Sequence, residues 1–474
     1  MKRLAIAVCL CSAGALFDGP AHASGILVTR FGGEQGHPTT DDPTAIYYNP
    51  AGLSLKPGKL RVYLNGILVY RQIGYDRPVN AIDNPGTGTP SDATAANSGK
   101  ASASNVAAIP FIAVASDLGI PHFGIGAAFF APFGGAASFN SNSAFMGNTS
   151  YPGAVDGVQR WWVIDGTIQS LYGSLAASYT IPSLHLSIGA AGNVVISQIS
   201  TLRARTSDGT DDLVDSQGGL KEGRSYLNVS GTSFSLGVGA ILEPIVDKLW
   251  LGLSYQSQPG FGETTLTGTI ENKFGLSSVK TSPVEVKQSM PDSIHFGARY
   301  RPMPTVELRL FGEYDRWSVF TDQCILDASV ANRSCATKAD GSAAGAGLLA
   351  YLPRNWHDTW AFRVGGSYFV KPSVELYLGA GYDGSAVPDA TMDPSLFDMT
   401  KIDFSLGGRF KVGDKLALAV TYTQVIFLDH TVPVRGTSAD VPPALAFPTR
   451  GPDGAGTYSS SVGLLNLGLE YRFM

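Results

Sequence analysis

Aspartate and histidine side chains are the residues of this sequence that could bind a metal ion. Four aspartates, Asp208, Asp211, Asp212 and Asp215, lie within one short segment, and calcium is bound by such oxygen ligands. Their spacing is not that of an EF-hand loop, and the histidines are scattered without an HExxH pair. We therefore expect a solvated acidic loop, no metal site and no cofactor.

Cysteine, serine and histidine side chains are the remaining candidates for reactive chemistry. Cys324 and Cys335 lie close together in the chain, and a close pair in an exported protein favours a disulfide across a small loop. Hydrolysis needs a nucleophile, a base and an orienting group in one place, and nothing in the sequence brings serine and histidine together. The sequence therefore predicts a protein that is not an enzyme.

The N-terminus has the organisation of an export signal. Lys2 and Arg3 precede a short apolar stretch, and Ala21-His22-Ala23 forms a small-x-small cleavage site. We expect residues 1–23 to be a signal peptide that is cleaved after Ala23. The net charge of −5 over 474 residues is mild, which argues against nucleic acid as a partner.

Alternation of apolar and polar residues defines the elements that follow. From Gly463 to Phe473 apolar and aromatic residues occupy one face, and Asn466 and Glu470 lie on the other. The same period of two recurs at 401–411 and elsewhere. Apolar residues toward lipid and polar residues toward a lumen are typical of a transmembrane barrel, although a soluble sandwich also alternates.

Connection lengths decide between a barrel and a sandwich. Short turns such as Ile181-Pro182-Ser183 alternate with long loops such as 320–356, as in barrels with short periplasmic turns and long outer loops. We predict an all-β fold, an antiparallel transmembrane β-barrel of about 14 strands over residues 59–474, in the outer membrane of a Gram-negative bacterium. The strands are expected near 59–73, 104–118, 122–131, 161–180, 184–206, 225–242, 248–268, 281–301, 305–319, 357–370, 373–383, 401–411, 415–428 and 459–473.

The two ends of the barrel sequence should pair with each other. In a bilayer every backbone N–H and C=O must be bonded, so the last strand has to close on the strand near 59–73. Asn466, Gly468, Tyr471 and Phe473 also fit the pattern of a C-terminal signal that barrel assembly machinery binds. We expect that machinery and the lipid of the outer membrane as partners, and a monomer.

Charged residues on the inward faces have two possible roles. The arginines could bind a ligand carboxylate, or they could form a lumen network with the neighbouring acids, and we favour the network. The arginines are Arg309, Arg363, Arg409 and Arg472, and the acids are Glu307, Glu313, Asp383, Asp403 and Glu470.

The segment 24–58 precedes the barrel and does not alternate. Gly, Pro, Asp and Thr make it irregular, and it could be a periplasmic tail or a plug inside the lumen. Its apolar residues, among them Ile26, Val28, Phe31 and Leu53, favour burial. We predict that residues 24–58 form an N-terminal plug, called the hatch below.

Several motifs in order along the chain resemble the FadL/TodX family of outer-membrane transporters of long-chain fatty acids and aromatic hydrocarbons. The hatch run Asp42 to Leu53, with Asn49-Pro50-Ala51 inside it, is similar to the hatch of that family. Further similar segments are Phe130-Ala131-Pro132-Phe133-Gly134, Met290-Pro291-Asp292-Ser293, Trp317-Ser318, Trp356 to Trp360 with Arg363 and Gly365, and Gly381 to Asp389.

The resemblance implies a function and two kinds of site. It implies passive uptake of hydrophobic small molecules, by rearrangement of the plug and lateral exit through the barrel wall. Ligand or plug contacts are then expected at Ser24, Gly25, Ile26, Val28, Asn49, Pro50 and Ala51, and a lateral opening at Pro132, Phe133, Gly134 and Gly135. Proline removes a ladder donor and glycine permits a bulge, so an opening is chemically reasonable there. The alternative is a structural or adhesin-type outer-membrane barrel without transport.

Overall fold

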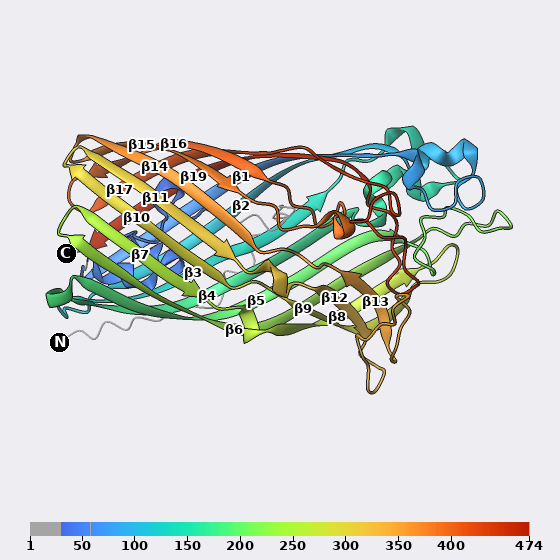
Figure 1. Cartoon of the computed structure of the whole chain (residues 1–474), viewed down its shortest axis with the longest axis horizontal. Helices are drawn as coiled ribbons and strands as arrows, with labels where there is room; N and C mark the ends of the chain where they lie inside the picture. The colour runs from blue at the N-terminus through green and yellow to red at the C-terminus, as the bar shows by residue number, and fades with distance from the viewer. Residues whose placement is uncertain (1–29, 57, 474) are drawn as a thin grey trace, which may run out of the picture.

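The computed structural model describes residues 30–56 and 58–473, and these form a closed antiparallel barrel of 14 strands. Figure 1 shows the barrel with its axis horizontal, the short turns at the left and the long loops at the right. We take the short-turn end as periplasmic and the long-loop end as the outer side, as in bacterial barrels.

Ten of the barrel strands are continuous in the structure. They are β1 (Leu60–Arg77), β2 (Gly99–Ser116), β3 (Phe123–Ser138), β4 (Asp165–Ile181), β5 (Leu186–Arg205), β6 (Gly223–Ile245), β15 (Val374–Asp383), β16 (Lys401–Val412), β17 (Leu416–Phe427) and β19 (Gly456–Phe473). A short strand, β18 (His430–Val432), pairs only with the outer end of β19.

The other barrel strands are each interrupted partway along. Their inner and outer parts are β7 (Leu249–Gln256) with β8 (Glu263–Lys273), β10 (Ser293–Met303) with β9 (Lys280–Ser289), β11 (Val306–Asp315) with β12 (Asp322–Asp327), and β14 (Thr359–Lys371) with β13 (Leu348–Pro353). The inner parts pair in the order β7-β10-β11-β14 and the outer parts in the order β8-β9-β12-β13.

The barrel closes between its first and last strands, as the sequence predicts. β1 and β19 are in register from Leu60–Phe473 to Asp76–Thr457. Side chains of β1 alternate between buried and exposed, with Leu64 and Leu68 outward and Asn65 and Arg71 inward. This apolar-out, polar-in alternation suits a wall between lipid and a lumen.

Strand existence was predicted better than strand extent. β3 was expected to end near residue 131 but continues to Ser138, and 248–268 was expected to be one strand but divides at Pro259–Phe261. The segment 320–356 was expected to be a loop, yet it contains β12 and β13. These expectations were wrong because a bulge or a short turn restores the same alternation on its far side.

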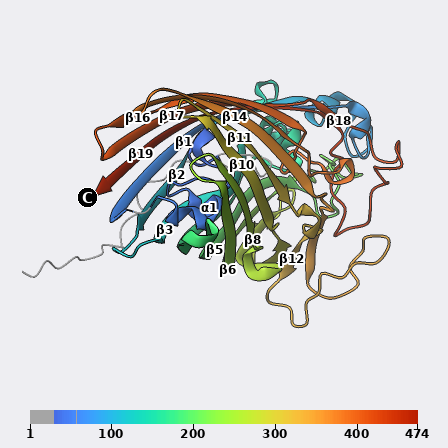
Figure 2. The same ribbon diagram turned by 60° about the vertical axis from the view of Figure 1, so that its left-hand side comes forward.

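Residues 30–56 lie inside the barrel at its periplasmic end, where Figure 2 shows α1 enclosed by the strands. The segment contains only short helical turns, at Gly33–Gln35, at Ala45–Tyr48 (α1) and at Pro50–Ser54. Nearly all of its side chains are buried. Among the described residues, no helix is both long enough and apolar enough to cross a membrane.

Candidate functional site: the hatch, the wall and the outer cavity

The described part of the hatch is bonded to opposite sides of the wall. The N–H of Gly32 donates to Asn65 Oδ1 on β1 at 3.0 Å. Arg30 forms a buried ion pair with Asp403 on β16, and Gln35 Nε2 donates to Glu375 Oε1 on β15 at 3.0 Å. Since these strands lie on one flank, the other flank must be held by a different part of the hatch.

Asn49, Pro50 and Ala51 hold that other flank. Asn49 Oδ1 accepts from the Ala51 N–H at 3.1 Å, and its Nδ2 donates to Ala240 O at 3.0 Å and Leu253 O at 3.3 Å on β6 and β7. A Cβ at Gly189 on β5 would lie 2.5 Å from Ala51 N, so the turn needs a glycine opposite it. These residues occupy an anchoring position, and direct ligand contact by them stays a prediction.

The predicted site residues Ser24, Gly25, Ile26 and Val28 lie outside the described residues, as does the signal peptide 1–23. The remaining candidates on β3 are described.

The wall is interrupted at the predicted residues of β3. The β2–β3 ladder runs from Ser116–Ile125 to Phe111–Phe130 and ends there. On the other edge, the β3–β4 register shifts between Phe130 and Phe133, because Pro132 has no N–H to donate and the strand bulges.

Farther out, β3 and β2 meet again. Phe133, Gly134 and Gly135 pair normally with β4. Asn140 then binds Ser102, with N–H to O at 2.9 Å and Nδ2 to Oγ at 3.1 Å. We call the stretch between the Phe111–Phe130 pair and the Ser102–Asn140 contact the first wall break.

Aromatic rings connect the hatch to the first wall break. The Phe31 ring centroid lies 4.9 Å from that of Phe111 and 5.5 Å from that of Phe130, the last ladder pair before the break. Phe130 stacks in turn on Tyr172, at 5.5 Å. A displacement of Phe31 would therefore change the packing of Phe111 and Phe130, the pair at which the β2–β3 ladder ends.

A cavity of about 370 Å³ occupies the outer half of the lumen. Apolar side chains from the strands make much of its wall: Ile168, Ile199, Leu227, Ile270, Val286, Ile325 and Leu352. The segments 389–396 and 441–454 line its other side, and on β3 the cavity reaches Gly135 and Ala137. The outer cavity thus extends to the strand that borders the first wall break.

Four arginines line the outer cavity, and three of them form ion pairs with acids, Arg450 with Asp83 at 3.2 Å among them. Arg354 Nη1 lies 3.0 Å from Asp393 Oδ2, and Arg435 Nε lies 3.9 Å from Asp453 Oδ1. The side chain of Arg203 on β5 forms no ion pair or hydrogen bond with the residues that the structure describes, although Asp393, the partner of Arg354, attracts it electrostatically. A cation on a largely apolar wall is a place where an anionic group would be stabilised.

The inward arginines nearer the periplasm are engaged with acids. Ion pairs join Arg363 to Asp383 at 2.8 Å, Arg409 to Glu375 at 3.1 Å and Arg472 to Glu470 at 2.9 Å. The predicted ion pairs of a lumen network are therefore confirmed for Arg363 and Arg472, whereas Arg409 pairs with Glu375, an acid outside the predicted set.

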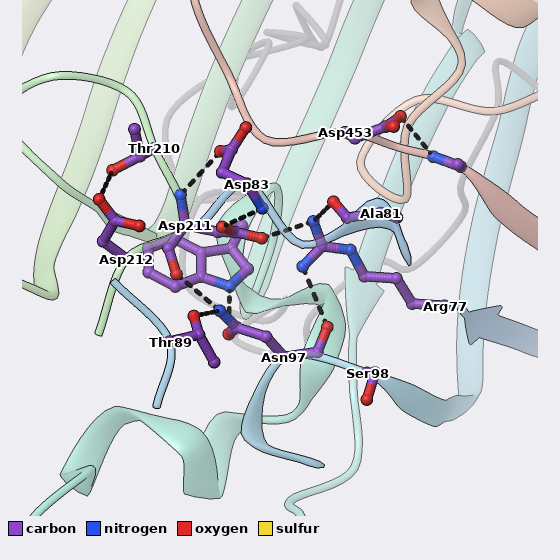
Figure 3. Close-up of polar contacts among 12 residues, drawn as sticks. Arg77, Ala81, Asp83, Thr89, Asn97, Ser98, Thr210, Asp211, Asp212 and Asp453 are labelled. Carbon is purple, nitrogen blue, oxygen red and sulfur yellow. Dashed lines mark hydrogen bonds and ion pairs between the residues drawn. The ribbon is translucent and has the colours of Figure 1, made fainter. Parts of the chain in front are cut away.

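Polar contacts join the outer loops to one another (Figure 3). Arg77 Nη2 lies 2.7 Å from Asp211 Oδ2, and Asn97 Nδ2 donates to Asp211 O at 2.6 Å. Trp161 Nε1 donates to Asn97 Oδ1 at 2.9 Å. Three separate loops, following β1, preceding β4 and following β5, are joined in this way.

The acidic segment 208–215 is part of these loops, and the solvated loop that the sequence suggests is correct for Asp208 and Asp215 but wrong for Asp211 and Asp212, which are buried. Asp211 is fully buried, and Asp212 lies 2.6 Å from Lys221 Nζ. Lys221 and Thr210 bind Asp208 and hold the pKa of its carboxyl at about 2, although its partial burial alone would raise the pKa. No group of three or more potential metal ligands occurs among residues 30–56 and 58–473.

Glu222 closes the same loop region. Burial alone would raise the pKa of its carboxyl, but Arg160 and Arg224 lower it below the usual range. Arg160 Nε lies 2.9 Å from Glu222 Oε1, and both side chains are buried.

Cys324 and Cys335 are disulfide-bonded, and they connect β12 to the loop that follows it.

These features define a class of protein: a closed barrel with an apolar exterior, a filled inner lumen and a capped outer cavity is an outer-membrane barrel. The profile of one family, described as outer membrane protein transport protein (OMPP1/FadL/TodX), matches residues 10–473. The chain belongs to this family, whose members are transport channels of the outer membrane and not enzymes.

Several solved structures have the same fold. A FadL homologue of Pseudomonas aeruginosa superposes with a TM-score of 0.72 at 17% identity, covering 95% of this chain and 100% of that chain. The toluene transporter TbuX of Ralstonia pickettii gives a TM-score of 0.61 at 16% identity, with 96% and 99% covered. The P. putida toluene transporter TodX gives 0.63 at 15% identity, also with 96% and 99% covered. No curated protein matches the sequence.

Sequence reasoning missed the outer cavity and Arg203. The cavity is assembled from strands and loops distant in the chain, so no local pattern indicates it. Arg203 carries a weak signal, since it continues the inward positions of β5 that Ser197 and Ile199 begin.

Proposed function

We propose that this chain takes up hydrophobic small molecules passively across the outer membrane, the substrates being long-chain fatty acids or aromatic hydrocarbons. A molecule would enter the outer cavity, move toward the hatch and leave sideways through the first wall break. The hatch would have to shift for this passage, since Phe31 contacts both strands at the break.

The observation that carries the proposal is that the outer cavity reaches Gly135 on β3, beside the first wall break. Apolar surface favours transfer of a hydrophobic molecule from water, and an opening toward lipid lets it leave without crossing water again. The family assignment and the toluene transporters of similar fold agree with this class of substrate.

Arg203 favours a ligand with an anionic head among these substrates. A carboxylate placed at Arg203 could lay its alkyl chain along Ile199 and Leu227, which line the same cavity. A charge-assisted hydrogen bond contributes about 1.5–3 kcal/mol, which separates a fatty acid from a neutral hydrocarbon of similar size.

Export and assembly complete the proposal. Cleavage after Ala23 would deliver the chain to the periplasm, and the strand ending at Phe473 would present the signal for barrel assembly machinery. We expect deletion of residues 471–474 to abolish heat-modifiable migration on gels, whereas deletion of Met474 alone should preserve it.

Uptake by cells tests the function directly. Cells lacking the protein are complemented with the wild type or with the double variant Gly134→Val and Gly135→Val, and uptake of radiolabelled oleate and toluene is measured. A Cβ at Gly134 would meet no atom closer than 3.8 Å, so a side chain can begin there without a clash, and heat-modifiable migration checks that the variant folds. The wild type should restore uptake, and the folded double variant should not. Equal uptake with and without the wild-type protein would instead favour a structural or adhesin-type barrel.

A further inference from the structure

A second interruption of the wall lies between β6 and its neighbour. β6 pairs with β7 as far as Gly237–Gln256 and with β8 from Ser230–Thr267 onward. Between these pairs, residues 231–236 of β6 face the longer segment 257–266. We call this stretch the second wall break.

The longer segment bulges as a turn instead of continuing the ladder. Ser257 is bonded to Leu236, with N–H to O at 2.8 Å and Oγ accepting from the Leu236 N–H at 2.9 Å. Beyond it Gly260 and Phe261 both have positive φ, 72° and 57°. That backbone region is unfavourable for a bulky residue such as phenylalanine, so the turn holds its conformation against local strain.

The strained turn places an aromatic ring outward. The side chain of Phe261 is 59% exposed, and that of Phe234 on β6 is 62% exposed. Both line one pocket of about 310 Å³. The turn, in yellow-green near the β6 and β8 labels of Figure 2, lies on the face of the wall that points away from the lumen.

This pocket crosses the wall. Its lining includes the outward residues Phe234 and Phe261 and the inward, buried residues Ser197 and Leu266. A pocket lined from both faces of a single sheet has to pass between strands, and here the missing β6 pairing provides the gap.

On its inner side the pocket adjoins the outer cavity. Ser197 and Ile199 are consecutive inward residues of β5, the first lining the pocket and the second lining the cavity. On β8 the inward residue Leu266 lines the pocket and the inward residue Ile270 lines the cavity. Ile199, Leu266 and Ile270 belong to one apolar cluster, so apolar surface is continuous from cavity to pocket.

The position of the second wall break suits an exchange with membrane lipid. Leu236, where the β6–β7 ladder has just ended, and Pro132 in the first wall break stand equally far from the periplasmic ends of their strands. Barrel strands cross the apolar band in roughly 9–11 residues, so both breaks lie near its outer boundary.

The lining of the pocket favours neutral molecules. Its lining contains no lysine or arginine, and its acid, Glu263, is paired with Lys287 at 3.2 Å. A carboxylate would find no arginine or lysine in the lining of this pocket, whereas an uncharged aromatic would contact Phe234, Phe261 and Leu266.

We propose that the second wall break is a further lateral port, through which neutral hydrophobic molecules of the size of a single aromatic ring pass between the outer cavity and the membrane. This inference rests on the proposed function and adds to it a second path with a different charge preference. The Gly260–Phe261–Gly262 turn would be the movable cover of the port.

The test fills the port with a bulky side chain. An ideal Cβ at Gly260 would lie 3.9 Å from the Ser233 Cβ, so Ser233 faces the turn and Ser233→Trp would occupy the gap. Ser230→Trp is the matched control, because Ser230 is exposed on the same strand but within the β6–β8 ladder. Toluene and oleate uptake are measured in cells producing equal amounts of heat-modifiable barrel.

We expect Ser233→Trp to roughly halve toluene uptake and to leave oleate uptake unchanged, while Ser230→Trp changes neither. Toluene uptake should fall further when Ser233→Trp is combined with Gly134→Val and Gly135→Val. If Ser233→Trp equals its control while the valine variant loses uptake, the port is refuted and the proposed function stands. If the wild type itself takes up neither molecule, both proposals fail.

Thiol labelling provides a readout that does not depend on flux. Because Cys324 and Cys335 are bonded to each other, a cysteine introduced at Ser233 would be the free thiol of the described chain. Toluene should slow alkylation of Ser233→Cys by a membrane-soluble maleimide, and should not slow that of Ser230→Cys. Equal protection of both positions, or of neither, would overturn the port.

Discussion

The inner and outer halves of the lumen are filled by different chemistry. In the inner half charged side chains meet in pairs, such as Arg61 with Glu470 at 2.8 Å and Arg299 with Asp41 at 3.1 Å, around the hatch. In the outer half a largely apolar cavity contains Arg203, whose side chain forms no ion pair or hydrogen bond with the residues described. The inner half is therefore rigidly cross-linked, and under the proposed function the outer half is the part that would accept a ligand.

The boundary between the two halves coincides with the first wall break. Phe31 of the hatch meets Phe111 and Phe130 at this level, and Phe130 ends the β2–β3 ladder. Buried ion pairs contribute little net stability but are costly to separate, so they hold the hatch in one arrangement. The aromatic contacts carry no such directional bonds and can slide.

Removal of the hatch should give the largest change. Deleting residues 24–56 removes the segment that fills the inner half of the lumen. The ion conductance of a 14-strand barrel without this segment should exceed the wild-type conductance by about tenfold or more. Planar-bilayer recordings measure this, with heat-modifiable migration as the check on folding. A wild-type conductance as large as that of the deletion would show that the hatch does not seal the lumen.

Replacement of Arg203 should weaken the binding of an anionic ligand in the outer half of the lumen. Arg203→Leu removes the charge and keeps an apolar wall, so oleate affinity should fall about tenfold or more while toluene uptake is retained. Arg205→Leu is the matched control, because Arg205 already donates to Leu349 O at 2.8 Å and does not line the outer cavity. Tryptophan fluorescence titration with oleate measures the affinity. Equal losses in both variants would mean that Arg203 is not the head-group site.

Loosening of the hatch should have a smaller effect than its removal. Asn49→Ala leaves the Ala240 and Leu253 carbonyls without their side-chain donor, at a cost of about 1–3 kcal/mol. We expect brief openings in bilayer recordings on a closed baseline. Asn84→Ala removes an amide bonded to Asp212 in the outer loops and should leave the baseline quiet. Openings of the same frequency in both variants would assign the effect to the outer loops.

The smallest effect is expected from the outer loops and depends on pH. The pKa of Glu222 is lowered in the folded protein. Its contribution to the stability of the outer loops is therefore fully present above the ordinary carboxyl range and is lost as pH falls through the lowered pKa. Proteolytic nicking of the outer loops should therefore rise on acidification.

Glu222→Gln tests the origin of that pH dependence. The variant should be nicked faster than wild type at neutral pH, because it leaves the buried Arg160 without its carboxylate, and its nicking should vary less with pH. Glu271→Gln, at an exposed position on β8, is the control. Identical pH profiles for Glu222→Gln and wild type would remove Glu222 from the explanation.

The sequence predicts the barrel well because one physical rule acts at every strand. Lipid outside and polar groups inside impose a period of two, as at 401–411 and at Gly463 to Phe473, and closure requires the first and last strands to pair. Pro132 could be identified as a break because a missing N–H is a local property.

Other features depend on contacts that no local pattern carries. The division between β7 and β8 could be missed because alternation resumes after the Gly260 turn, and the burial of Asp211 depends on Arg77 and Asn97 from another loop. The outer cavity likewise exists only when 389–396 and 441–454 close over strands far away in sequence.

The seam between β1 and β19 sets an order of events during biogenesis. Nearly the whole barrel sequence separates these strands. The backbone groups on one edge of β1 therefore stay unpaired until β19 has crossed the inner membrane. The hatch precedes β1 and bonds to Asn65 on β1, to Ala240 on β6 and to Asp403 on β16. A segment enclosed on all sides must be in place before the seam shuts, so the hatch can act during assembly as an internal template around which the sheet curls.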